Sequence, residues 1–164
     1  MGLFNREEKR KRLIERNLMD IRYGDFIIYF DEDYEVYAVI EWVEEGYIWK
    51  EYKLRKNNEE AYWLNVEIDD GEVLAYFHTL IKDYPVPAQL PDILKYNGKE
   101  YKLHDKGNAS GKLTSRVGDQ FYQCRYYDYK NGNEILSIED FKADIEVSIG
   151  VELIKSQIEI LPGG

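Results

Sequence analysis

The sequence predicts a mostly β protein made of two pseudo-repeated antiparallel β units packed together, as a sandwich or as partly open barrels, with one N-terminal helix. Two observations lead to this fold class. Short runs rich in β-branched and aromatic residues alternate with turn sequences along most of the chain. Two blocks of sequence also recur in the same order, at offsets of 67 and 72 residues.

The composition is that of a folded, acidic protein. Its 164 residues carry a net charge of -10 and include 15 Tyr and a single Cys. The acidic balance disfavours a nucleic-acid binder, because contacts to phosphates need a basic face. One cysteine gives no disulfide framework, and no apolar run approaches the ~18 residues of a membrane span. These residues therefore give no argument for secretion or for a membrane span.

Residues 1–22 are expected to form a basic helical leader, with a helix from about Arg6 to Leu18. This segment has a net charge of +3, whereas the remainder has -13. Its basic and apolar side chains would allow at most peripheral contact with an anionic membrane, or contact with a partner protein. The alternative is a solvated, partly frayed leader. The candidate contact residues are Phe4, Arg10, Lys11 and Ile14.

The first β repeat is assigned to residues 23–81. Five strand-like runs are separated by turn sequences, at 26–30, 34–42, 47–54, 61–68 and 73–80. Side chains alternate between the two faces of a strand, so Trp49 and Glu51 share one face and Tyr52 lies on the other. Neither face is purely apolar, as expected for a half-covered sheet.

A connector with three prolines, residues 82–91, separates this repeat from a second one at 92–164. Asn97-Gly98 and Asn131-Gly132 predict two-residue hairpin turns. The glycine-containing stretch at 107–112 predicts a flexible loop, and residues 138–144 allow a single helical turn.

The internal repeat rests on two gap-free alignments. Residues 25–36 align with 92–103, which matches Tyr34 to Tyr101. Residues 64–67 align with 136–139, which matches Glu67 to Glu139, and the strand that follows keeps the same offset. Each repeat is too small to form a good core alone, so we expect the two to pack against each other.

Several short sequence motifs, taken together, resemble those of the bacterial domain-of-unknown-function family numbered 4178. They are YGDFIIY (23–29), WKEYKL (49–54), YWLNVE (62–67), YNGKEYKL (96–103) and LSIE (136–139), and the similarity covers about residues 18–161. The resemblance implies a cytoplasmic bacterial protein without assigned activity. It also implies that genes of this family lie near those of membrane-stress proteins and of relatives of polyamine aminopropyltransferases. The resemblance supplies no catalytic residues.

The expected function is non-enzymatic binding or scaffolding on the acidic and aromatic faces between the repeats. Carboxylates and aromatic rings suit a cationic partner, either a protein or a small cationic ligand. No cofactor or metal is expected, since His78 and His104 are isolated from other ligand-type residues. The candidate binding residues are Trp49, Glu51, Tyr52, Trp63, Glu67, Tyr127 and Glu139.

Three other expectations remain open. A carbohydrate-active or other hydrolase would use Glu51, Glu67 or Glu139 as paired carboxylates. A membrane-surface adaptor would act through the leader. An exposed sheet edge would allow a second copy to pair, which makes a homodimer one expected assembly.

Overall fold

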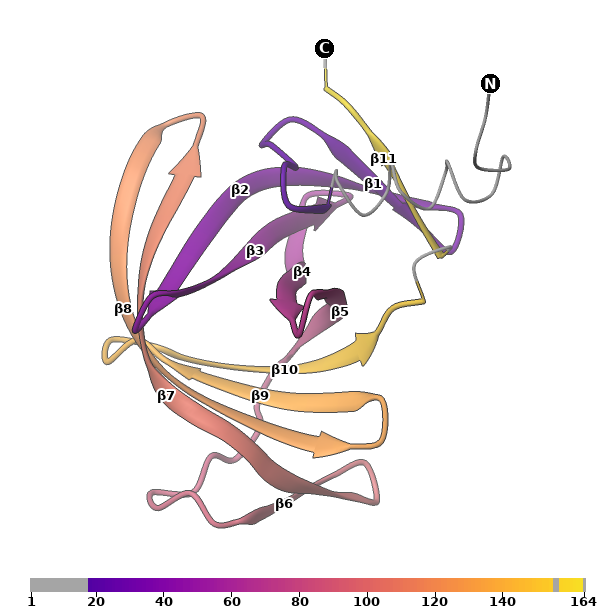
Figure 1. Ribbon diagram of the computed structural model, residues 1–164. Helices are drawn as coiled ribbons and strands as arrows, with labels where there is room; N and C mark the ends of the chain where they lie inside the picture. The colour runs from indigo at the N-terminus through magenta and orange to yellow at the C-terminus, as the bar shows by residue number, and fades with distance from the viewer. Residues whose placement is uncertain (1–17, 155–156, 164) are drawn as a thin grey trace.

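The computed structural model describes residues 18–154 and 157–163, and strands make up most of them (Figure 1). All of the strands join in one antiparallel sheet, which confirms the prediction of a mostly β protein. The strands are β1 (Phe26–Tyr29), β2 (Glu32–Glu44), β3 (Tyr47–Lys56), β4 (Glu59–Asp69), β5 (Glu72–Ile81), β6 (Ile93–Tyr96), β7 (Lys99–Ser115), β8 (Gly118–Asn131), β9 (Glu134–Asp140), β10 (Ile145–Glu152) and β11 (Ile158–Leu161).

Eight of these strands close into a ring. The hydrogen-bonded order β2-β3-β4-β5-β10-β9-β8-β7 returns to its start through pairing of β2 with β7. Strands β1 and β11 extend from β2, and β6 extends from β7, so all three lie outside the ring. The sheet is therefore continuous from residues 26 to 161, where the sequence led us to expect two sheets packed face to face.

One of the two predicted hairpin turns forms at the predicted residues. The other is shifted by one residue, because Asn131 pairs with Glu134 and leaves Gly132 and Asn133 as the turn. Asn97 and Gly98 have φ values of 52° and 78°, and positive φ at both central residues is the geometry of a type I′ turn. This turn joins β6 to β7, as predicted. The single helical turn expected within 138–144 is not formed. Asp140 pairs with Ile145 instead, so the segment makes the hairpin between β9 and β10.

The predicted flexible loop at 107–112 is wrong, because these residues lie inside β7, which pairs with both β2 and β8. The glycines there serve a close approach between strands. A Cβ at Gly111 would stand 2.6 Å from the ring of Trp42, and one at Gly107 would clash with the carboxylate of Glu44. Both partners belong to β2, so the glycines make room where the ring closes.

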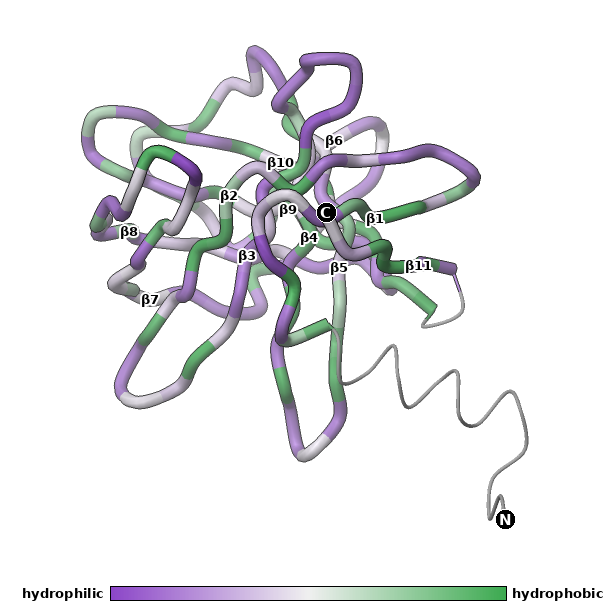
Figure 2. Tube along the Cα trace, turned by 90° about the horizontal axis from the view of Figure 1, so that it is seen from above, coloured by the Kyte–Doolittle hydropathy of each residue, from purple (hydrophilic) through white to green (hydrophobic). Residues whose placement is uncertain are grey.

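Two apolar cores lie on the outer face of the ring. In the first, β1, β11 and the segment around Leu18 and Ile21 cover the outward side chains of β3, β4 and β5. In the second, β6 and the proline-containing connector, through Val86 and Leu90, cover those of β8, β9 and β10. Figure 2 shows the hydrophobic and hydrophilic residues that alternate along the strands. This alternation sends one set outward into the cores and the other into the ring.

The leader lies almost wholly outside the described residues. This holds for the predicted helix from Arg6, apart from Leu18 at its end, and for all four candidate contact residues, Phe4, Arg10, Lys11 and Ile14. The leader's role as a membrane or partner contact stays a prediction. Within the described ranges, we find no helix with the length and apolar character needed to cross a membrane.

The close approach at the β2–β7 junction makes a prediction for stability. Gly111→Ala places a methyl group against the ring of Trp42, and overpacking of this kind costs about 1–3 kcal/mol of unfolding free energy. Urea denaturation followed by tryptophan fluorescence measures the change. The neighbouring exposed Lys112→Ala is the matched control and should change stability by less than about 0.5 kcal/mol. Equal stability of the two variants would show that the junction tolerates a side chain at position 111.

Candidate functional site

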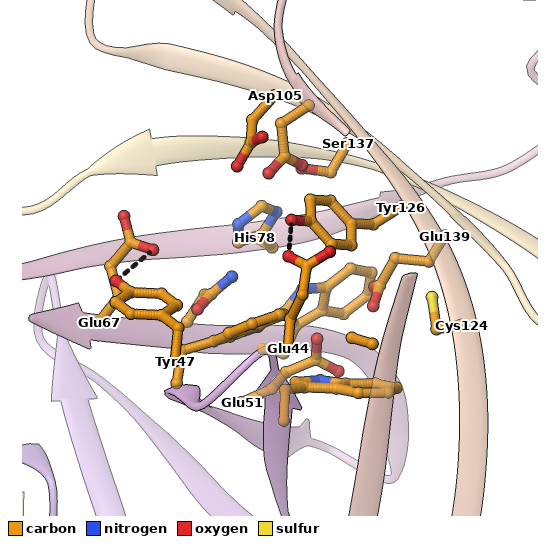
Figure 3. Close-up of a pocket in the computed structure, with 16 residues that line it drawn as sticks. Glu44, Tyr47, Glu51, Glu67, His78, Asp105, Cys124, Tyr126, Ser137 and Glu139 are labelled. Carbon is orange, nitrogen blue, oxygen red and sulfur yellow. Dashed lines mark hydrogen bonds between the residues drawn. The ribbon is translucent and has the colours of Figure 1, made fainter. Parts of the chain in front are cut away.

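The ring encloses a cavity of about 110 Å³ (Figure 3). It is lined by three tryptophans, two tyrosines and six carboxylic acids, contributed by β2, β3, β4, β7, β8 and β9, with His78 from β5. The lining residues are Trp42, Glu44, Tyr47, Trp49, Glu51, Trp63, Asn65, Glu67, His78, Asp105, Ala109, Cys124, Tyr126, Asp128, Ser137 and Glu139. The inside of the ring thus combines carboxylic acids with a third apolar cluster, formed by Ile40, Trp42, Ala109 and Cys124, while the two larger apolar cores lie outside it.

Most of the binding residues expected from sequence meet in this cavity. They are Trp49, Glu51, Trp63, Glu67 and Glu139. Tyr52 and Tyr127 do not join them. Tyr52 is buried in the first outer core, where its hydroxyl donates to the carbonyl of Leu18 at 2.6 Å. Tyr127 packs against the second outer core. Each is adjacent in sequence to a lining residue, and adjacent side chains of a strand point to opposite faces.

Other lining residues were missed by the sequence reasoning. Tyr47 lies on the same face of β3 as Trp49, and Asp128 lies on the same face of β8 as Cys124. The alternation of side chains along a strand was therefore a sufficient signal for placing both residues. The sequence indicated Trp42, with Trp49 and Trp63, only as part of an alternative stacking platform, and it gave no signal for Glu44. Both residues reach the cavity through the pairing of β2 with β7, which no local pattern reveals.

A lysine balances part of the negative charge. Lys53 Nζ lies 2.9 Å from Glu51 Oε2 and 3.6 Å from Glu146 Oε2, and 4.5 Å from the centre of a ring of Trp63. Burial lowers the pKa of Lys53, but the carboxylates of Glu51, Glu139 and Glu146 outweigh this effect and raise it above the ordinary range. The lysine therefore stays charged, and its own ammonium group is the cation that lies over the face of Trp63.

Three carboxylic acids of the cavity, Glu67, Asp128 and Glu139, have raised pKa values. Burial, with Glu51 as the main neighbouring charge, raises the pKa of Glu139 well above the ordinary value. Burial also raises the pKa of Glu67 and, to about 7, that of Asp128. The hydroxyl of Ser137 donates to Asp128 Oδ1 at 2.7 Å, which opposes the shift only in part. Burial in this cavity thus favours the protonated forms of these three acids over their ionised forms.

His78 lies at the wall formed by β5 and β10. Its side chain is buried, stacks on Trp63 with ring centres 5.5 Å apart, and has Nδ1 2.9 Å from Ser148 Oγ. Burial lowers its pKa to about 3, so the imidazole is neutral at pH 7. Gly150 pairs with it across the strands, and a Cβ there would stand 2.7 Å from the imidazole ring.

Two tyrosine–glutamate pairs bridge different strands of the lining (Figure 3). The hydroxyl of Tyr47 donates to Glu67 Oε2 at 3.3 Å, and burial raises its pKa to about 12. The hydroxyl of Tyr126, on β8, donates to Glu44 on β2. The second carboxylate oxygen of Glu44 accepts the amide N–H of Asn108 at 3.0 Å, so this pair ties β8, β2 and β7 together.

Two further features of the site concern its cysteine and its ligand-type side chains. Burial raises the pKa of the Cys124 thiol, which keeps it protonated and unreactive. In the described part of the chain, no group of three or more His, Cys, Asp or Glu side chains is placed to hold a metal ion. The arrangement presents carboxylic acids and aromatic faces around one cavity.

Comparisons with known proteins place the chain in a family without assigned function. No curated protein and no solved structure matches it. Residues 22–154 match the family model of the domain of unknown function DUF4178. This match spans most of the chain and nearly all of the ring, and the protein therefore belongs to the DUF4178 family.

Proposed function

We propose that the protein binds a small organic cation inside the ring. The observation that carries this proposal is the lining itself, which combines six carboxylic acids and three tryptophans with no lysine or arginine among the described residues that form it. Ammonium groups bind favourably over aromatic faces and beside carboxylates, and more strongly when water is excluded. Lys53 already makes such contacts at the edge of the site, with Glu51 and Trp63.

Electrostatics favours an occupant with positive charge. Several carboxylates that share one enclosed volume cannot all ionise without a compensating charge. The raised pKa values of Glu67, Asp128 and Glu139 are consistent with protons taking that place when no other cation is present. A ligand cation would replace these protons and restore the carboxylates as partners.

The volume of the cavity restricts the class of ligand. Sites for drug-sized ligands measure about 300–1,000 Å³. A cavity of about 110 Å³ suits instead a slender aliphatic amine, or one arm of a longer one. Spermidine is a suitable first probe, because it is linear and carries several ammonium groups. Its use also follows from the polyamine-related gene context that the family resemblance implies.

A hydrolase with paired carboxylates is the second candidate. The observation that favours it is that Glu51, Glu67 and Glu139 all line one cavity. The raised pKa of Glu139 would suit a general acid, with Glu51 as the neighbouring carboxylate. The small cavity is the argument against a sugar ring as substrate. Release of the chromophore from nitrophenyl glycosides, absent in Glu139→Gln, would support this reading.

We also propose that the ring arose by duplication of one β unit. Asp25 O accepts the N–H of Val36 and Asp92 O accepts that of Leu103, both at 2.8 Å, and the two positions differ by 67 residues in each case. The pairing of Glu67 with Leu74 in β4–β5 likewise has the same offset of 72 as that of Glu139 with Glu146 in β9–β10. These correspondences support two equivalent halves that contribute equivalent side chains to the cavity.

Titration calorimetry with spermidine tests the binding proposal. Binding at about 20 mM NaCl should weaken at about 200 mM, because salt screens the attraction. Glu67→Gln removes one carboxylate of the lining and should raise Kd about tenfold. Glu100→Gln, on the exposed surface of β7, is the control and should leave Kd unchanged. Absence of salt-sensitive binding of spermidine and of shorter diamines would refute a cation site.

The pKa of Asp128 predicts a pH dependence of stability. Its pKa is about 7 in the folded protein, against an ordinary value of ~3.9 when unfolded, so the folded state binds more protons between these values. The unfolding free energy should therefore fall as pH rises through this window. Between pH 5 and 8 we expect the wild type to lose about 1–3 kcal/mol relative to Asp128→Asn, in urea denaturation at each pH.

The exposed Asp119→Asn on the same strand is the control, and its stability should follow that of the wild type. Asn can still accept the hydrogen bond from Ser137, so Asp128→Asn isolates the titration from the loss of a contact. If the unfolding free energies of the wild type and Asp128→Asn change in parallel with pH, Asp128 is ionised throughout this range.

A further inference from the structure

Three polar atoms of the cavity lining have neither a hydrogen-bond partner nor an ion-pair partner, whereas the buried Glu51 Oε2 is paired with Lys53. They are Trp42 Nε1, Asn65 Oδ1 and His78 Nε2, which are buried and unpaired with respect to the described residues. Buried polar groups in native proteins are almost always satisfied, and each exception costs about 1–3 kcal/mol. Three of them around one cavity indicate that its occupant supplies the missing partners.

The indole of Trp42 sets the strictest requirement. Its N–H group can only donate a hydrogen bond, so its partner must be an acceptor. The ring lies close over Gly111 on β7 and stacks on Trp49, with ring centres 6.4 Å apart. The side chain is 1% exposed, so bulk water does not reach the N–H freely. An alkylammonium group has no lone pair to offer and leaves this donor unsatisfied.

The other two atoms need a group that both donates and accepts. Asn65 Oδ1 is an acceptor and requires a donor. His78 Nε2 donates or accepts according to the tautomer, which depends on whether Nδ1 or Ser148 Oγ carries the hydrogen between them. A hydroxyl group donates once and accepts twice, so it has the capacity that each of the three atoms requires of a partner.

We infer that the ligand of this cavity carries a hydroxyl group as well as a positive charge and belongs to the small amino alcohols. This inference rests on the proposed function, because it concerns the occupant of the same site. A carboxylate on the ligand would also accept from Trp42, but the six carboxylic acids of the lining disfavour it. An amino sugar would provide hydroxyls on a ring too bulky for about 110 Å³.

The test compares three four-carbon amines that differ at one end: 4-amino-1-butanol, n-butylamine and 1,4-diaminobutane. Calorimetric titration of the full chain at pH 7 and low salt gives Kd for each. We expect 4-amino-1-butanol to bind about fivefold more tightly than n-butylamine, as one additional hydrogen bond would provide. Trp42→Phe should reduce this ratio to about one. Trp49→Phe, at the stacked neighbour, should retain it.

A second measurement does not depend on the stability of a core variant. In wild-type protein with ¹⁵N-labelled tryptophan, the indole N–H resonance of Trp42 should move downfield with 4-amino-1-butanol and stay in place with n-butylamine. Suppose that all three amines bind, that 4-amino-1-butanol has no lower Kd than n-butylamine, and that the Trp42 resonance does not move. The inference is then overturned, while the proposed cation site stands. If none of them binds, and spermidine does not bind either, the proposed function is lost as well.

Discussion

The whole architecture depends on the close approach of β2 and β7. Strands in a sheet lie about 4.8 Å apart, and the large side chains of Trp42 and Glu44 point inward at this contact. Only strand positions without side chains can accept them, which is why β7 has Gly111 opposite the indole and Gly107 opposite the carboxylate. Without this pairing the sheet would be an open ribbon, and the lining residues of its two ends would not meet.

Closing the ring gives its two faces different packing. Two apolar cores lie on the outer face, under strands and segments that fold over it. The inside holds a third apolar cluster, around Ile40, Trp42, Ala109 and Cys124, beside carboxylic acids and a neutral histidine, whose burial costs free energy. The two outer cores therefore stabilise the fold, and the interior is an arrangement that packing alone does not explain. Burial of charge at this expense is characteristic of functional sites.

Much of the fold could be predicted from sequence, because strand and turn signals are local. The Asn97-Gly98 turn and the strand runs rest on a few adjacent residues. The inward face of β3 also followed from the period of two, which placed Trp49 beside Glu51. The closure of the ring could not be predicted, since it pairs residues such as Val43 and Ser110 that are far apart in the chain. Glycine at 111 suggested mobility, although its role is steric.

The two junctions that close the ring have a consequence for how the chain folds. Val43 pairs with Ser110, and His78 pairs with Gly150, so each junction joins segments about seventy residues apart. Closing such distant contacts is entropically costly before it is rewarded, and proteins dominated by them fold slowly, in about milliseconds to seconds. Hairpins within each half are local and can form first. Until the strands at the two junctions have paired, the chain exposes unpaired strand edges. Newly synthesised molecules of this topology are therefore prone to self-association before folding is complete.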